Sequence, residues 1–209
     1  MDAAELLALV RAELAPVARS LAEHRYFVEL ESGRVPLKSL RIFAGEQRAI
    51  IVSDRNSFEH LMHRFPEPPA ADFFRELAAG EVEALGLLQR FAAAVGLGGE
   101  YEPLAGCQAY SAYVAWLALN GSPPDVALAF LANLETWGRS CARMRAALRP
   151  EYGDDALAFF EFFAQAPQGF EERALALVAT GEPSSARRAA RLLQAYELLY
   201  WDTLADGLH

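Results

Sequence analysis

Apolar residues recur every three or four positions along almost the whole chain, which is the spacing of one face of an α-helix. Alternating patterns typical of strands are absent, and glycine and proline mark the ends of the periodic segments. We therefore expect an all-α protein with short loops and a single domain over residues 1–209. The expected helices are 2–31 with a kink at Pro16, 36–64, 71–79, 81–95, 103–119, 123–148, 153–164, 170–180 and 184–205.

The last expected helix has a glutamate on its apolar face. In LLQAYELLYWDTL (192–204), Leu193, Tyr196 and Tyr200 share one side of the helix. At roughly 100° per residue, Glu197 falls about 40° from Leu193, inside the same arc. A carboxylate in a protein core costs several kcal/mol unless it is hydrogen-bonded, paired or neutralised, so Glu197 needs an explanation.

The helix expected at 36–64 has the same feature. Gln47 and Asp54 lie within its apolar stripe, and their seven-residue spacing separates them by only about 20° around the helix. One interpretation is a polar pocket inside the bundle, where ligand sites are built from facing helices. The other is a structural network that holds the helices in register.

Aromatic residues support either interpretation. Tyr110 and Tyr113 lie three positions apart, and tyrosines can both stack on a flat ring and hydrogen-bond it. Aromatic stripes at helical spacing also form ordinary cores.

Histidines give little sign of a metal or heme site. His60 and His63 have one-turn spacing but project away from the side that carries Gln47 and Asp54, and His24 is a lone candidate for a heme ligand. The chain has no Glu-x-x-His pair, no glycine-rich phosphate loop and no serine nucleophile elbow. We therefore expect no metal and no cofactor.

Composition narrows the class of partner and the compartment. The chain is 53% hydrophobic with a formal net charge of −9, which argues against binding to nucleic acid. Cys107 and Cys141 lie in apolar surroundings and resemble buried thiols of a reducing compartment. The sequence shows neither a signal peptide nor an uncharged stretch of the roughly 18 residues that a membrane helix needs, so we expect a cytoplasmic protein without a membrane partner.

Three segments resemble, in order, the TenA/PqqC-like family. They are HRYFVELESGRVPLKSLRIFAGEQ (24–47), AYSAYVAWLALNGSPPDVALAFLANLETWG (109–138) and LLQAYELLYWDTL (192–204). The resemblance implies a heme-oxygenase-like helical bundle that forms a homodimer or larger assembly. TenA proteins hydrolyse aminopyrimidine compounds in thiamin salvage, PqqC relatives are oxidases, and other relatives use a di-metal centre.

The resemblance also implies a role for Glu197. It matches the glutamate of the family's closing motif, which reaches the substrate pocket of TenA enzymes and acts in proton transfer. An apolar pocket raises the pKa of a glutamate, which suits a general acid. The residues that we expect to bind the ligand are Phe43, Gln47, Asp54, Tyr110, Tyr113, Asn133 and Tyr196.

Other family positions are occupied by different residues. Arg48 stands where TenA has an aspartate, Leu134 lies near the position of its nucleophilic cysteine, and Gly138 replaces a tyrosine. The histidines of the metal-using relatives, expected near Ala84 and along the last helix, are absent. Asp54, on a different turn, is a candidate for the missing carboxylate.

Three functions therefore stay open. The first is a divergent hydrolase of small heteroaromatic compounds in which Glu197 is the acid/base. The second is a non-catalytic homologue that binds a metabolite or a partner. The third is a cofactorless oxidase of PqqC type.

Overall fold

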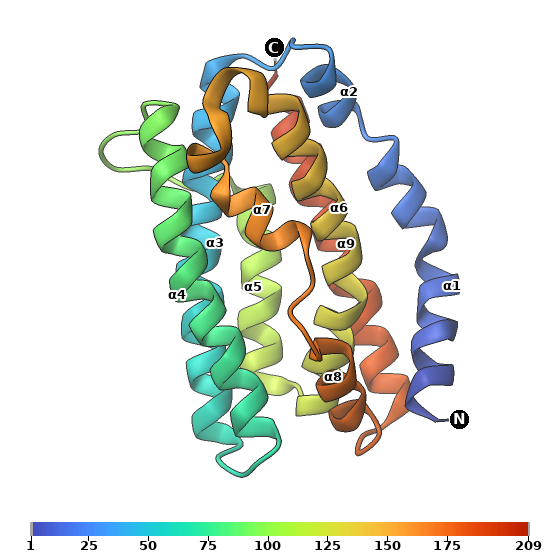
Figure 1. The fold of residues 1–209 in the computed structure, drawn as a ribbon. Coiled ribbons are helices and arrows are strands. Elements are labelled where there is room, and N and C mark those ends of the chain that lie inside the picture. Colours follow the sequence, from blue (N-terminus) through green and yellow to red (C-terminus); the bar gives the residue numbers. More distant parts are fainter. Residues whose placement is uncertain (1, 209) are drawn as a thin grey trace.

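The computed structural model describes residues 2–208, and every regular element in that range is an α-helix, which confirms the expected all-α fold (Figure 1). The helices are α1 (Ala3–Ala22), α2 (Arg25–Glu31), α3 (Leu37–Arg64), α4 (Ala70–Ala94), α5 (Ala105–Asn120), α6 (Pro123–Ala156), α7 (Ala158–Ala164), α8 (Phe170–Val178) and α9 (Pro183–Asp206).

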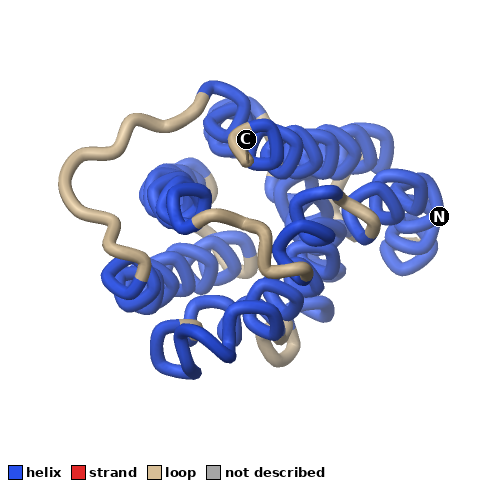
Figure 2. The backbone as a smooth tube through the Cα atoms, turned by 90° about the horizontal axis from the view of Figure 1, so that it is seen from above, coloured by secondary structure: helices blue, strands red, loops and turns tan. Residues whose placement is uncertain are grey.

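The long helices form a bundle with an interior that several of them share. α3 packs along α4, α6 packs along α9, and α5 contacts both α3 and α9. α1 lies against α9, while the short α7 crosses in front of the bundle and contacts α4 and α6 (Figure 1). Seen from above, loops join the helices at the ends of the bundle (Figure 2). Within residues 2–208, no helix is long and apolar enough to cross a membrane.

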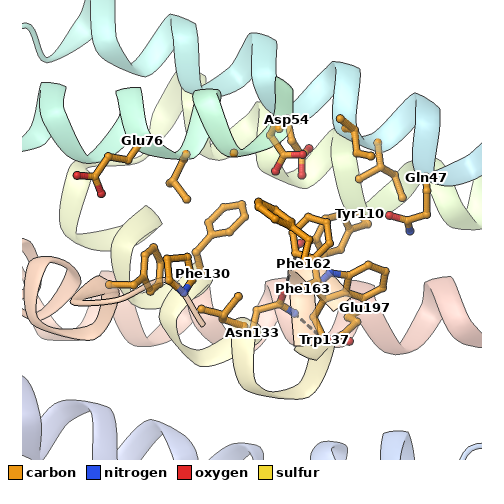
Figure 3. Close-up of a pocket in the computed structure, with 18 of the residues that line it drawn as sticks. Gln47, Asp54, Glu76, Tyr110, Phe130, Asn133, Trp137, Phe162, Phe163 and Glu197 are labelled. Atoms are coloured by element: carbon orange, nitrogen blue, oxygen red, sulfur yellow. Dashed lines mark hydrogen bonds between the residues drawn. The ribbon is translucent and has the colours of Figure 1, made fainter. Parts of the chain in front are cut away.

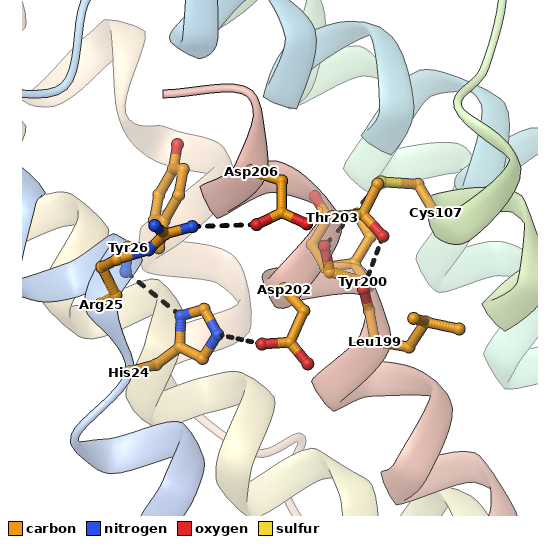
Figure 4. Close-up of polar contacts among 9 residues, drawn as sticks. All are labelled: His24, Arg25, Tyr26, Cys107, Leu199, Tyr200, Asp202, Thr203 and Asp206. Carbon is orange, nitrogen blue, oxygen red and sulfur yellow. Dashed lines mark hydrogen bonds and ion pairs between the residues drawn. The ribbon is translucent and has the colours of Figure 1, made fainter. Parts of the chain in front are cut away.

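The prediction of one N-terminal helix over 2–31 with a kink at Pro16 is wrong. Pro16 lies inside α1, and the chain instead breaks after Ala22. The break has a local cause, because the Nδ1 atom of His24 accepts a hydrogen bond from the backbone N–H of Tyr26 and caps α2. The Nε2 atom of His24 lies 3.0 Å from Oδ1 of Asp202 on α9, so both ring nitrogens have partners (Figure 4).

Two further helix boundaries differ from prediction. The segments 71–79 and 81–95 are one helix, α4, because Gly80 weakens a helix by only about 1 kcal/mol and does not break it. The helix expected to end at residue 148 continues as α6 to Ala156. Gly153, where the next helix was expected to begin, has non-helical backbone angles with a φ of 72°, a value that favours glycine, so the regular helix is interrupted there and α7 itself begins at Ala158.

Near the C-terminal end of α9, the bundle has an aromatic core around Trp201. Its indole is fully buried and packs on the rings of Tyr26, Phe27 and Phe43. Nearby, α5 passes α9 so closely that a Cβ atom on Gly106 would lie 2.0 Å from Thr203 Oγ1. The packing around Trp201 and Gly106 fills this end of the bundle, and the cavity described below lies outside it.

Candidate functional site

A cavity of about 180 Å³ lies inside the bundle, between α3 and α4 on one side and α6 and α9 on the other. α7, α8 and the segment between them complete its wall. Figure 3 shows Asp54 on α3 facing Asn133, Trp137 and Glu197 across this space. The principal polar residues of the lining are Gln47, Asp54, Glu81, Tyr110, Asn133 and Glu197. Its aromatic residues include Phe130, Trp137, Phe162, Phe163 and Phe170.

Glu197 is held by one of its two carboxylate oxygens. Oε2 accepts hydrogen bonds from Nδ2 of Asn133 at 2.6 Å, from Oγ1 of Thr136 at 2.9 Å and from Nε2 of Gln194. Oε1 is buried and has no hydrogen-bond partner among residues 2–208. The side chain is therefore fixed in position while one oxygen remains available.

Burial raises the pKa of Glu197 from 4.5 to about 7. The hydrogen bonds from Thr136, Gln194 and Asn133 lower it again, because they stabilise the charged form. Trp201 also lowers it, although its Nε1 makes no hydrogen bond of normal geometry. The balance leaves a carboxyl group that can hold or release a proton near neutral pH.

Tyr110 and Glu197 are joined through one amide. The hydroxyl of Tyr110 donates to Oδ1 of Asn133 at 3.3 Å, and Nδ2 of Asn133 donates to Glu197. Burial raises the pKa of Tyr110 well above its usual value, and the neighbouring charges of Asp54, Glu197 and Glu81 add to the effect. Tyr110 therefore remains a neutral hydrogen-bonding group in the middle of the acidic part of the cavity.

Asp54 and Glu81 form a pair of carboxyl groups on α3 and α4. Burial raises the pKa of Asp54 well above its usual range, and the charge of Glu81 raises it further. Burial also raises the pKa of Glu81, to about 8. Nearby on α3, Nε2 of Gln47 donates to the hydroxyl of Tyr200 at 2.8 Å, so Gln47 links α3 to α9 at the edge of the cavity.

The fold and the site have counterparts among known proteins. The family model described as TENA/THI-4/PQQC family matches residues 11–207. The chain belongs to this family. No curated protein matches the chain.

Solved structures agree with the family's fold. A TenA homologue from P. horikoshii OT3 is 16% identical with a TM-score of 0.77, over 97% of this chain and 99% of that one. A TenA homologue from Pseudomonas syringae pv. tomato is 14% identical with a TM-score of 0.79, over 99% and 96%. A domain from Shewanella denitrificans, described as having a heme oxygenase-like fold, is 12% identical with a TM-score of 0.75, over 96% and 92%. These likenesses confirm the predicted heme-oxygenase-like bundle.

The cavity brings together most of the residues that the sequence predicted to form the site. Gln47, Asp54, Tyr110, Asn133 and Glu197 all line it. The other three do not reach it. Phe43 packs against Trp201. The rings of Tyr113 on α5 and Tyr196 on α9 pack against each other, with their centroids 5.1 Å apart.

The positions that depart from TenA have distinct surroundings. Arg48 points to the carbonyl of Gly99 and does not line the cavity, whereas Leu134 does line it. At Gly138, a Cβ atom would meet the carbonyl oxygen of Phe163 at 3.0 Å, so α7 covers this position. Cys107 and Cys141 are buried outside the lining, and burial raises the pKa of both thiols. No residue at these positions supplies the missing nucleophile.

Sequence reasoning missed Glu81 and the two residues that support Glu197. Glu81 shares the apolar face of α4 with Leu77, Ala84 and Leu88, but this pattern is visible only when 70–94 is taken as one helix. Thr136 and Gln194 are ordinary polar residues in sequence. Gln194 lies one turn before Glu197 on α9, whereas Thr136 comes to Glu197 only through the packing of α6 against α9.

Proposed function

We propose that this TenA-family protein binds a small heteroaromatic molecule in the cavity and that Glu197 exchanges a proton with it. The substrate class that we favour is an aminopyrimidine-type compound. The observation that carries the proposal is the geometry of Glu197, whose Oε2 takes three hydrogen bonds while Oε1 has no partner among residues 2–208.

Amide N–H groups of Asn133 and Gln194 point at Oε2, so the proton of the neutral acid belongs on Oε1. A pKa of about 7 makes both protonation states accessible at neutral pH, as acid–base catalysis requires. In hydrolysis of an aromatic amine, the neutral acid protonates the leaving amino group, and the resulting carboxylate takes a proton from the attacking water. The ring carbon then gains the water oxygen and the C–N bond breaks to release ammonia.

A second candidate function is binding without turnover. The cavity lining, as far as residues 2–208 define it, contains no cysteine, serine, threonine, histidine or lysine. Covalent catalysis through such a nucleophile therefore has no candidate in the lining, which favours either direct hydrolysis by water or a purely binding role.

The test compares Glu197→Gln with the parent protein on a panel of aminopyrimidines. The glutamine keeps an acceptor for Asn133, Thr136 and Gln194 but loses the acid, so turnover should fall about 100-fold or more. The free energy of unfolding should change by less than about 1 kcal/mol or rise. Glu46→Gln is the matched control, because Glu46 is buried on α3 but does not line the cavity.

Each outcome of this comparison has a definite meaning. Binding by the parent protein without turnover would favour the binding role. A loss of several degrees in melting temperature for Glu197→Gln, with binding unchanged, would show that Glu197 is a structural anchor.

The proposal includes two further expectations. We expect a homodimer or tetramer, and the exposure of Trp116 (49%) and Leu119 (63%) on α5 supports an apolar contact surface. A stable monomer in sedimentation at micromolar concentration would contradict this. The cytoplasmic location remains a prediction from the sequence.

A further inference from the structure

Asp54 and Glu81 form a part of the cavity wall that no other residue of the range 2–208 neutralises. Asp54 is only 3% exposed, and its buried Oδ1 has no hydrogen-bond partner in the described part of the chain. Within residues 2–208, neither carboxyl group has a hydrogen bond or an ion pair. Figure 3 shows the Asp54 side chain directed into the cavity. Buried carboxylates are costly when unpaired, so this wall is suited to a partner that enters the cavity.

The surroundings increase the negative character of this wall. Glu197 adds a third acidic group from α9, and the charges of all three carboxyl groups raise the pKa of Tyr110 on α5. Arg173 is the one basic residue of the lining within the described chain, but its Nε lies 2.8 Å from Oε2 of Glu76, which also lines the cavity. Because Arg173 is paired with Glu76, no basic side chain among residues 2–208 is left as a counter-ion for Asp54 and Glu81.

We propose that Asp54 and Glu81 bind the cationic end of a flat organic ligand through an ammonium, amidinium or guanidinium group. Two carboxyl groups from neighbouring helices suit the several N–H donors of such a group. The rings of Phe130, Phe162 and Phe163 line the same cavity and can stack on the rest of the ligand. The inference rests on the proposed use of this cavity and names the class of ligand that it takes.

The cation must be strongly basic. It has to stay protonated at the pH where the pair ionises, and the pKa of Glu81 is about 8. An aliphatic amine, with a pKa near that of lysine at about 10.4, meets this condition. A weakly basic aromatic amine would bring no charge. The subsite therefore selects ligands with a basic substituent over plain aminopyrimidines.

A divalent metal is the less suitable occupant. Within residues 2–208, no group of three or more histidine, cysteine, aspartate or glutamate side chains could hold a metal ion. Magnesium requires near-octahedral oxygen ligands, of which this pair supplies only part. The apolar rings that form much of the remaining wall favour an organic ligand.

The test uses benzamidine as a cationic probe and benzamide as its neutral counterpart, titrated calorimetrically into the full chain near neutral pH. Benzamidine should bind at least tenfold more tightly than benzamide. Asp54→Asn and Glu81→Gln should each remove most of this difference. Glu83→Gln is the matched control, because Glu83 is an exposed residue of α4 outside the cavity lining, and it should change the affinity less than twofold.

Proton release gives a second measurement. Because the cation favours the charged pair, binding near pH 7 should release part of a proton, measured by comparing buffers with different ionisation enthalpies. The release should disappear in the double variant. If Asp54→Asn fails to fold, Glu81→Gln alone, at a less buried position, still supports or overturns the proposal.

Equal binding of the two probes, or cation binding that survives both substitutions, would overturn the subsite. Tight Mg²⁺ or Mn²⁺ binding that is lost in the same variants and competes with benzamidine would reassign it to a metal. Benzamidine has no amino group on an aromatic ring carbon, which is the group that the proposed hydrolysis removes. Failure to find turnover therefore leaves this test unaffected, and failure of the probe to bind leaves the role of Glu197 open to its own test.

Discussion

Glu46 and Asp54 lie on the same helix, about two turns apart, and both are buried, yet they serve different regions of the bundle. Oε1 of Glu46 accepts hydrogen bonds from the hydroxyl of Tyr101 at 2.6 Å and from the backbone N–H of Leu104 at 2.7 Å. Asp54 has neither kind of partner within residues 2–208.

The surroundings of Glu46 are closed by the chain itself. The ring of Tyr101 covers Gly45 so tightly that a Cβ atom there would lie 2.5 Å from it. Glu46 thereby attaches the segment between α4 and α5 to α3. Asp54 instead faces a cavity. Burial alone therefore does not distinguish a structural carboxylate from one at a ligand site. Glu46 is hydrogen-bonded to a neighbouring segment of the chain, whereas Asp54 lines the cavity and has no protein donor among residues 2–208.

The largest expected effect is the pH dependence of stability. The pKa values of Glu197 (about 7) and Glu81 (about 8) in the folded protein lie above the ordinary value of 4.5 for a glutamate. The folded protein therefore binds these protons more tightly than the unfolded chain, so stability falls as pH rises from about 4.5 to about 8. The shift of Glu197 alone corresponds to ~3 kcal/mol. Urea unfolding at pH 5 and pH 8 measures this loss.

The control for the pH effect is the triple variant Asp54→Asn, Glu81→Gln, Glu197→Gln. It should lose most of the pH dependence. The remainder should come from Glu46, whose pKa burial also raises. Equal stability of the parent protein at both pH values would mean that the cavity carboxyl groups titrate normally and are well solvated.

The second largest effect is the loss of stability expected when the hydrogen bonds of Glu46 are removed. Glu46→Ala leaves the Tyr101 hydroxyl and the Leu104 N–H without their acceptor, which should cost about 2–4 kcal/mol in the free energy of unfolding. Glu59→Ala is the control on the same helix. The Glu59 side chain is exposed and forms an ion pair with Arg55 at 3.6 Å, so its removal should cost less than about 0.5 kcal/mol. Equal effects of the two changes would show that Glu46 stabilises the protein no more than an exposed glutamate does.

Sequence periodicity predicted much of the fold, and of the two buried carboxylates on α3 it identified Asp54 but not Glu46. It identified the apolar stripe of α3 and the misplaced Asp54, because both depend only on spacing along one helix. It did not distinguish Glu46, whose partners Tyr101 and Leu104 lie more than 50 residues away along the chain. Hydrogen-bond partners across helices depend on the rotation and height of each helix, which local periodicity does not specify.

In the candidate site too, features that depend on spacing along one helix were predicted, and features that depend on packing between helices were not. Glu197 and Asp54 were found as polar residues on apolar faces, and the cavity includes both. Phe43 was expected to bind the ligand on its place in a stripe, but α3 directs it to the Trp201 core. Glu81 was hidden by treating Gly80 as a helix end. A glycine is a weak helix breaker, so neighbouring patterns should be tested across it before a boundary is accepted.

The smallest expected effect is also the most direct test of the contrast between satisfied and unsatisfied carboxyl groups. Asp54→Asn keeps the size of the side chain and removes a buried carboxyl group that has no partner among residues 2–208, so at pH 8 it should stabilise the protein by up to about 1 kcal/mol. Because burial raises the pKa of Asp54, this gain should be smaller at pH 5 than at pH 8. Asp125→Asn is the matched control. Asp125 is also buried, but its Oδ2 accepts hydrogen bonds from the backbone N–H and hydroxyl of Ser122 at the start of α6. Its substitution should therefore destabilise the protein, by about 1 kcal/mol, at both pH values. If Asp54→Asn lowered the free energy of unfolding as much as Asp125→Asn, Asp54 would be a structural residue. Its carboxyl group would then no longer favour a cationic ligand in the cavity.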